Sequence, residues 1–331
     1  MRRLIALASA GLLAAGALAL ALHVRAPATA PSKLTIAVPR QLSSGAVFVA
    51  RDHGDFADRS LAVDVRSYTL GKQALQAVLD DQADLALVAD VPFMLASRRG
   101  APIAAVATVF ASRQAMALVG RRDRGIGGLA DIGGKSVGTV KGTNAEYFLD
   151  LLIGTSIRDG AAPVILQLQP DQVGVALDGT SIDAVTAWNP LLANILRQQG
   201  DNAVVMRIPD LFVFRFLLVG KRSFIEANPA VVRSTLQALS QAINYIQQQP
   251  APAQALIAAA VGLQPQQLQA SFRTEDFALS LDQSLLLSLE DQTRWAVRKG
   301  LVDAGPAPNY LEAIDLRPLA AAVPDAVTII H

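Results

Sequence analysis

Short apolar runs alternate with helix-patterned segments along the first two thirds of the chain. A first unit reads as strand, polar turn, helix and strand, at 34–40, 43–45, 45–51 and 61–68. A second unit reads as strand, turn and helix, at 134–140, 141–144 and from Ala145 onward. Alternating strands and helices predict an α/β fold with mostly parallel sheets, whose ligands lie beyond the carboxyl ends of the strands. Both polar turns follow such ends.

Further apolar runs lack any alternation of polar and apolar positions, which is typical of strands covered on both faces. Two of them, at 85–89 and 103–110, are flanked by helical patterns at 72–80 and 93–99. Two similar runs frame the middle of the chain, and we interpret them as crossings between lobes, at 115–120 and 214–220. After Lys221 the pattern becomes helical, with predicted helices at 229–245, 252–261, 264–271 and 282–299.

These patterns predict two α/β lobes joined by two crossing segments. Residues 33–115 would form the first part of lobe 1, and residues 116–220 would form lobe 2 with a crossing strand at each end. Residues 221–331 would return as helices and complete lobe 1. The 331 residues suffice for two lobes of about 100–200 residues each.

The first 32 residues read as an export signal followed by a linker. Three residues with two arginines precede an uncharged apolar run at 4–22, and Ala26-Pro27-Ala28 offers a cleavage site of small residues. The run exceeds the usual signal core of about 7–15 residues and approaches the ~20 of a spanning helix. Release into the periplasm and anchoring in the inner membrane by residues 4–22 therefore both stay open. The absence of cysteine excludes a lipoprotein anchor, disulfides and thiol catalysis.

Composition excludes several classes of function. An apolar fraction of 52% excludes a disordered chain, and 29 basic against 28 acidic residues provide no basic field for nucleic acid. Histidine occurs only at His23, His53 and His331, so no metal site of His and Cys can be assembled, and a Ser-His-Asp arrangement has at most one candidate. We read His53 as a helix-capping residue. We expect a protein that is not an enzyme and holds no cofactor or metal.

The turn at Thr143 and Asn144 is a candidate ligand contact. It stands between a predicted strand and a predicted helix, so its backbone N–H groups and the positive end of the helix dipole would face the cleft. An anion is the natural occupant of such a position. The alternative, which is compatible with binding, is that either side chain only caps the helix, with Glu146 in its first turn.

Polar residues also follow two predicted strands of the first lobe. Ser43 and Ser44 form a turn there, and Arg40 just before them offers a charge partner for a carboxylate or sulfonate. The serines could instead be caps and the arginine solvated. Asp90 follows the apolar run at 85–89, where it would either receive an ammonium group or cap the helix at Phe93.

Trp188 ends a further predicted strand, directly before Asn189-Pro190. A large amphipathic ring at the edge of a sheet can wall a pocket and donate one hydrogen bond. Ordinary packing between the lobes is the alternative. Trp295 falls on the apolar spacing of the last long helix, and we expect it in the core.

Taken in order, several segments resemble the periplasmic substrate-binding proteins of ABC importers. The resemblance is to the nitrate, taurine and aliphatic-sulfonate class and its relatives that bind thiamine-precursor pyrimidines. The segments that carry it are LTIAV at 34–38, GKQALQAVL at 71–79, ADLAL at 83–87, GGKSV at 133–137 followed by Gly142-Thr143, and LDGTSIDA at 177–184 followed by Trp188-Asn189-Pro190. This resemblance implies a type II periplasmic-binding fold that closes over its ligand and then docks on a membrane permease.

The resemblance also implies a set of ligand contacts at the loop after the first strand, the turn at Asp90, the helix start after Gly142 and the strand end at Trp188. In this chain these positions are Ser43, Ser44, Asp90, Thr143, Asn144 and Trp188, and a further region before the return crossing ends at Phe214.

We therefore expect a monomeric receptor for a small organic or oxyanion ligand, of the sulfonate, taurine or nitrate kind, that serves an ABC permease and its ATPase. Asp90 would receive the amine of a taurine-like ligand. The alternative is a membrane-tethered protein that senses a ligand and signals to a partner. An enzyme is disfavoured, because the related enzymes use a cysteine-rich motif and a pocket histidine.

Overall fold

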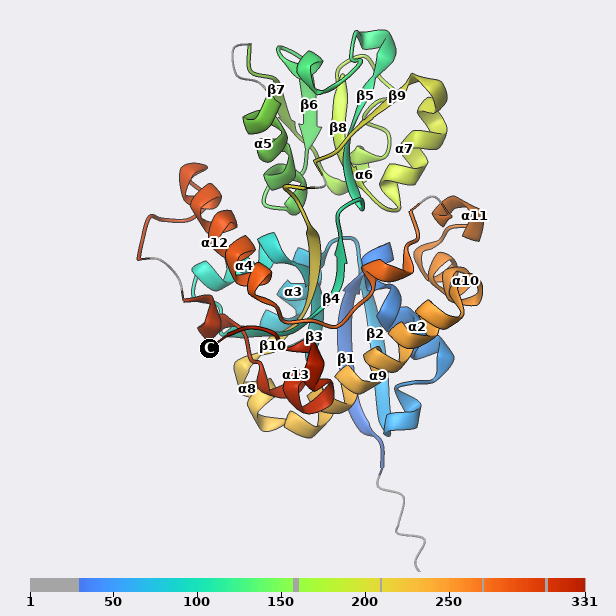
Figure 1. Cartoon of the computed structure of the whole chain (residues 1–331), viewed down its shortest axis with the longest axis vertical. Helices are drawn as coiled ribbons and strands as arrows, with labels where there is room; N and C mark the ends of the chain where they lie inside the picture. The colour runs from blue at the N-terminus through green and yellow to red at the C-terminus, as the bar shows by residue number, and fades with distance from the viewer. Residues whose placement is uncertain (1–29, 157–160, 209, 270, 307–308, 331) are drawn as a thin grey trace, which may run out of the picture. The chain divides into compact units, whose positions relative to one another are not determined.

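The computed structural model describes residues 30–156, 161–208, 210–269, 271–306 and 309–330 (Figure 1). Residues from Ser32 onward form one compact unit. The predicted leader at 4–22 lies outside the described residues. Within the described ranges, no helix has both the length and the hydropathy needed to cross a bilayer.

The first lobe is built on a five-stranded sheet in which four strands point the same way and one is reversed. The parallel strands come from βαβ units, and the reversed strand β10 enters the sheet later in the chain, after the second lobe. Its middle strand β3 is buried along its whole length, as the unbroken apolar run predicts. Across the sheet the order is β2 (Leu61–Tyr68), β1 (Ser32–Pro39), β3 (Leu85–Ala89), the reversed β10 (Phe214–Lys221) and β4 (Ile103–Ser112).

The second lobe repeats this design with another five-stranded sheet. Four strands are again parallel to one another, and the reversed strand again lies next to the edge. The predicted α/β class with mostly parallel sheets is therefore confirmed. The order is β7 (Val164–Gln167), β6 (Ser136–Thr139), β8 (Ala184–Trp188), the reversed β5 (Met116–Arg121) and β9 (Ala203–Met206).

Two short connections, at 113–115 and 207–213, join the sheets (Figure 1). The prediction that the runs at 115–120 and 214–220 themselves cross between lobes is wrong. Strand β5 pairs only within the second sheet, whereas β10 pairs with β3 and β4 of the first, so the second lobe ends before residue 214 rather than at 220. An apolar run shows that a strand is buried, but it does not show which sheet the strand joins.

Helices cover both sheets, and the segment after Lys221 returns to the first lobe. There α9 and α10 pack on α2, and α12 packs on α4. Most predicted helices are present, but α4 begins at Asp90, three residues earlier than predicted, and α11 is a single turn. The helices are α2 (Gly45–His53), α3 (Gly71–Leu79), α4 (Asp90–Arg98), α5 (Asn144–Ser156), α6 (Pro170–Val173), α7 (Leu191–Gln199), α8 (Arg222–Ala227), α9 (Pro229–Gln248), α10 (Pro250–Val261), α11 (Pro265–Leu268), α12 (Gln283–Arg298) and α13 (Arg317–Ala322).

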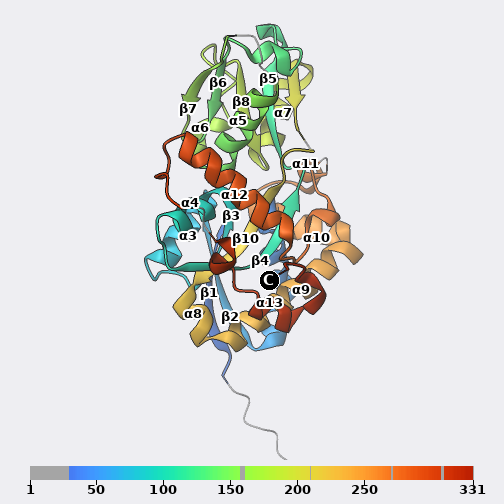
Figure 2. The ribbon, with the colours of Figure 1, turned by 60° about the vertical axis from the view of Figure 1, so that its left-hand side comes forward.

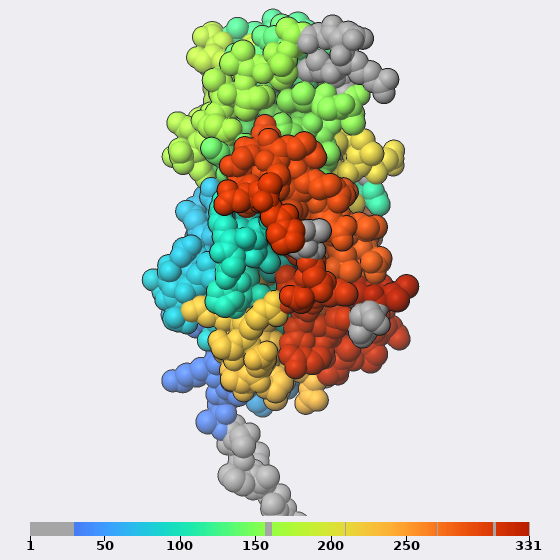
Figure 3. Space-filling view, turned by 90° about the vertical axis from the view of Figure 1, so that its left-hand side faces the viewer, coloured from blue at the N-terminus to red at the C-terminus, as the bar shows by residue number. Residues whose placement is uncertain are grey.

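Helix α12 ties the return segment to the second lobe (Figures 2 and 3). The indole Nε1 of Trp295 donates a hydrogen bond to Asp150 Oδ2 on α5 at 2.7 Å, and Lys299 Nζ lies 3.0 Å from the same oxygen. The ring of Trp295 also packs edge-on against Tyr147 of α5 at 5.2 Å between centroids. Trp295 is buried, as expected, but it lies between the two lobes rather than inside one.

Asp276, in the single turn η6 (Thr274–Asp276), lines a depression beside both connections together with Arg113 and Val213. Burial raises the pKa of its carboxyl to about 6, although a hydrogen bond with Ser112 opposes the shift. The folded protein therefore keeps this proton at a pH where the unfolded chain has lost it. Stability contributed by the group is present below about pH 4 and is lost as the pH rises through about 6.

We expect Asp276→Asn to raise the free energy of unfolding at pH 7 by about 1 kcal/mol, because the amide removes the cost of a partly buried charge that solvent screens in part. At pH 4 the gain should vanish. Urea denaturation at both values measures the difference, with Asp64→Asn as the control, since the side chain of Asp64 is 59% exposed. An equal gain at pH 4 and pH 7 would contradict the assignment.

Candidate functional site

A cavity of about 40 Å³ lies where the carboxyl ends of strands from both sheets meet. This is the position at which α/β sheets bind ligands, because strand ends and helix starts converge there. The first lobe contributes residues that follow β1 and β3 and precede α3, and the second lobe contributes the start of α5 and the end of β8. The lining residues are Gln41, Leu70, Gly71, Lys72, Ala89, Pro92, Met116, Thr143, Asn144, Ala145, Trp188, Phe214 and Phe216.

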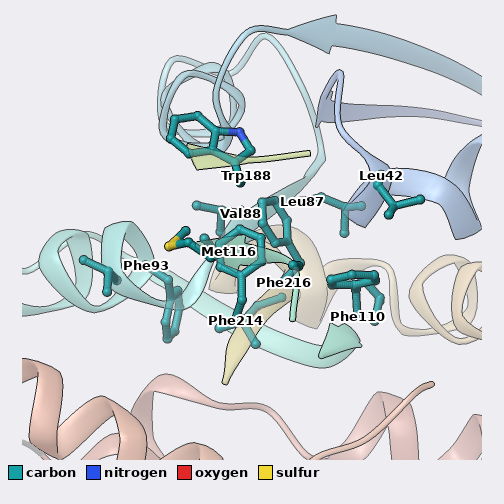
Figure 4. Close-up of a cluster of buried hydrophobic side chains, with 14 of the residues drawn as sticks. Leu42, Leu87, Val88, Phe93, Phe110, Met116, Trp188, Phe214 and Phe216 are labelled. Atoms are coloured by element: carbon teal, nitrogen blue, oxygen red, sulfur yellow. The ribbon is translucent and has the colours of Figure 1, made fainter. Parts of the chain in front are cut away.

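The cavity has an aromatic and apolar wall (Figure 4). Trp188, Met116, Phe214 and Phe216 all line the cavity and belong to the cluster of buried side chains in Figure 4, where Trp188 is drawn above the other three. Trp188 is only 5% exposed and pairs with Met116 in the β5–β8 register. The rings of Phe214 and Phe216 meet edge to face at 5.2 Å, which fixes their orientation. A ligand here would therefore meet rigid, desolvated apolar surface.

On one side the cavity adjoins a groove of about 790 Å³ that shares Gln41, Leu70 and Trp188 with it. The groove is lined mainly by polar side chains, among them Arg40 and Gln73. Arg40 is exposed and lines this groove rather than the cavity itself. The structure thus brings Thr143, Asn144, Trp188 and Phe214 together around the cavity and places Arg40 at its outer side.

The helix start at Thr143 and Asn144 is capped by the protein's own side chains. The hydroxyl of Thr143 donates to the Val140 carbonyl at 2.7 Å and accepts the Ala145 N–H at 3.2 Å. The carboxylate of Glu146 accepts the Gly142 N–H at 2.7 Å. The capping alternative is therefore present, and a ligand anion at these N–H groups would compete with a carboxylate already there. Contact of Thr143 and Asn144 with ligand stays a prediction.

Asp90 does not line the cavity. It is fully buried at the start of α4, where Oδ1 accepts from Asn144 Nδ2 at 2.5 Å and Oδ2 accepts from Gln292 Nε2 at 2.7 Å. Burial raises the pKa of Asp90, while the charge of Arg215 and the two hydrogen bonds lower it. Because both oxygens are taken by protein donors, the expected contact with a ligand ammonium is not available. Asp90 instead links α4 of one lobe to α5 of the other.

Among the buried polar groups of the described residues that have no hydrogen-bond partner, two lie close in sequence to Gln41 and Trp188, which line the cavity. These are the hydroxyl of Ser43 and the side-chain amide of Asn189, which is 4% exposed. Unpaired buried groups are rare in folded proteins, and a bound ligand or water is a common explanation. Ser44, in contrast, is satisfied, since its hydroxyl donates to the Pro39 carbonyl at 2.7 Å.

Sequence reasoning missed several of these residues. Gln41, Met116 and Phe216 line the cavity but resemble ordinary turn or core residues in the sequence. Asn189 carried one signal, its place directly after Trp188 at a strand end. The residues found by pattern were those next to a strand end, and those missed reach the cavity only through the packing of the two lobes.

Neither catalytic nor metal chemistry is concentrated at the cavity. In the described ranges, no three His, Cys, Asp or Glu side chains come close enough to hold a metal ion. His53 ends α2 and lies away from the cavity, with its Nδ1 2.8 Å from Asp55 and its ring against Tyr245 at 4.2 Å. The arrangement can hold a small molecule by apolar contact and hydrogen bonds.

Several known proteins are similar to this chain. It is 22% identical to a putative binding protein of Brucella abortus over 60% of this chain, and it spans 61% of that relative's length. It is 26% identical to a putative aliphatic sulfonates-binding protein of Escherichia coli over 80% of this chain and 81% of that protein. The chain thus spans less than two thirds of the first of these two relatives.

The fold of this chain is also similar to that of a solved protein structure. The crystal structure of the periplasmic aliphatic sulphonate binding protein SsuA from Escherichia coli aligns with a TM-score of 0.72 and 20% identity, covering 83% of this chain and 89% of that one. The fold is therefore the two-lobed fold of periplasmic binding proteins. Residues 41–253, more than half of the chain, match the family model described as NMT1/THI5 like. The chain belongs to the NMT1/THI5-like family.

Proposed function

We propose that the protein is an extracytoplasmic receptor that captures a small organic anion between its two lobes and delivers it to an ABC permease. One observation carries this proposal: a desolvated cavity lined by both lobes at the carboxyl ends of their strands. A ligand that touches both lobes stabilises their closed arrangement, because it has fewer contacts when they separate. The sulfonate-binding relatives support the same class of ligand.

The lining of the cavity favours an anion with an apolar part over nitrate. Trp188, Met116, Phe214 and Phe216 offer apolar surface that a bare oxyanion could not use. The Ser43 hydroxyl and the Asn189 amide are unpaired and stand close in sequence to the lining residues Gln41 and Trp188, and we propose them as neutral donors for the anionic oxygens. Taurine should bind less well than an alkyl sulfonate, because Asp90 is occupied by protein donors.

The proposal includes a place of action and partners. Periplasmic relatives support export to the periplasm, where a receptor would act as a monomer and dock on a permease with its ATPase. Inner-membrane anchoring by residues 4–22 concerns a segment outside the described residues. No nucleic acid is expected as a partner, because basic and acidic residues balance at 29 and 28.

The test is a titration with hexanesulfonate, benzenesulfonate, taurine and nitrate, followed by tryptophan fluorescence and melting temperature. We expect the first two compounds to change fluorescence saturably and to raise the melting temperature, with recovered ligand unchanged. Trp188→Phe should remove most of the fluorescence change, whereas Trp295→Phe should keep it. A flat melting temperature with all four compounds, or conversion of the bound compound, would contradict the proposal.

A further inference from the structure

A second groove adjoins the cavity, and Arg40 is not among the residues that line it. This groove of about 440 Å³ shares Lys72 and Pro92 with the cavity and runs between α3 and α4. Its floor is apolar and includes Leu75 and Leu95. Lys141 and Gly142 of the second lobe also line it. The groove is therefore a mouth of the cavity to which both lobes contribute.

Every charged side chain that lines this mouth is positive. Lys72 comes from the first lobe, Lys141 from the second, and Arg99 lies at the far end of the groove, where it donates to the Leu301 carbonyl. The groove of about 790 Å³ differs, because its lining includes Asp80 and Asp171 as well as Arg40. The electrostatic potential of the 440 Å³ groove is therefore more positive than that of the 790 Å³ groove. An anion is drawn to the groove that Lys72 and Lys141 line.

The charges of these two lysines do not stabilise the helices beside them. Lys72 is in the first turn of α3, and Lys141 is three residues before the start of α5. Helix starts favour negative charge, so lysines there oppose the helix dipole. Both are exposed, and neither makes an ion pair with another described residue. Glu146 nearby is buried and binds the Gly142 N–H.

We propose that Lys72 and Lys141 form a charge gate that selects anionic ligands. In the described arrangement these two positive charges, one from each lobe, line one groove, where they repel each other and oppose a closed arrangement of the lobes. A negative ligand in the cavity offsets that repulsion, so closure is favoured with an anion and opposed with an uncharged analogue. This inference rests on the proposed function and names how that site excludes neutral compounds.

The first test measures affinity for benzenesulfonate and for methyl phenyl sulfone, an uncharged analogue of similar size. Lys72→Gln and Lys141→Gln should each weaken benzenesulfonate binding about fivefold, with less dependence on salt, because an exposed ion contact contributes modestly. Binding of the sulfone should stay equal or improve. Lys33→Gln is the matched control, since Lys33 is exposed at the opposite end of β1 and should change neither affinity.

The second test needs no ligand. In Lys72→Glu or in Lys141→Glu the mouth holds opposite charges, so each single variant should favour closure and show a smaller radius of gyration at low salt. The double variant Lys72→Glu/Lys141→Glu restores like charges and should return to the wild-type radius. X-ray scattering at low and high salt measures this cycle.

The outcomes separate this gate from the proposed function. If benzenesulfonate binds but Lys72→Gln and Lys141→Gln have no effect, the gate is overturned and the receptor function stands. If no sulfonate binds, the function as proposed fails, and the scattering cycle alone decides whether the two lysines repel across the mouth. Equal radii in the wild type and all three charge variants would also overturn the gate.

Discussion

Replacing Asp90 with alanine is expected to lower the free energy of unfolding by about 3–5 kcal/mol, the range for breaking a buried charged pair. Asp90 is fully buried and accepts hydrogen bonds from Asn144 and Gln292. Its charge also faces that of Arg215, which is 7% exposed and otherwise donates to the hydroxyls of Ser284 and Ser288. Alanine would leave the buried amide donors of Asn144 and Gln292 without this acceptor, and it would remove the negative charge that offsets the nearly buried Arg215.

Urea denaturation of Asp90→Ala and Asp64→Ala measures this loss. Asp64 is the matched control, because its side chain is 59% exposed and its ion pair with Arg66 is a surface one, so its loss should cost under about 1 kcal/mol. Asp90→Asn keeps the shape of the side chain but directs one of its N–H groups at a donor. Its loss of unfolding free energy should lie between those of Asp90→Ala and Asp64→Ala. A loss for Asp90→Ala as small as that of Asp64→Ala would show that Asp90 is not the centre of this network.

The same network explains why the sequence left two readings of Asp90 open, a contact with a ligand ammonium and a helix cap. A carboxylate directly after an apolar strand is well placed for a ligand, and this reasoning is sound as far as the backbone is concerned. The partners that occupy its oxygens come from Asn144 and Gln292, which are 54 and 202 residues away along the chain. No local pattern reports contacts at that separation. Sequence reasoning therefore placed the residue near the site and could not tell that its oxygens were already bonded.

The strands and the fold class could be predicted because their signal is local. The run at 85–89 is apolar throughout and is buried throughout as β3, and the turns after β1 and β6 carry the polar residues expected there. The interpretation of β10 as a crossing between lobes was wrong because strand pairing is not a local property. Its run at 214–220 is apolar apart from Arg215, and only pairing with β3 and β4 places it in the first sheet. Pairing partners, like those of Asp90, are not local.

The cavity shows the same division between what is local and what is not. Trp188 was predicted because it stands at a strand end, and it lines the cavity. Phe216 and Met116, which complete the wall, come from the two reversed strands, whose places in the sheets the pattern did not give. The ligand-binding role of all these residues stays a proposal, and a substitution at Trp188 tests it most directly.

Trp188→Ala is expected to weaken binding of benzenesulfonate by at least about 30-fold, the effect of removing a buried aromatic residue that contributes 2 kcal/mol or more to binding. Trp188 is 5% exposed and lines the cavity together with Met116, Phe214 and Phe216, so alanine would replace a rigid wall with solvent. Trp188→Phe restores most of the apolar wall without the indole N–H and should lose less than tenfold in affinity.

Calorimetric titration at a temperature well below each variant's melting point separates lost affinity from lost stability. Trp295→Phe, which removes the other tryptophan but leaves the cavity lining intact, should bind more tightly than Trp188→Ala. Wild-type affinity in Trp188→Ala would place the ligand elsewhere in the molecule.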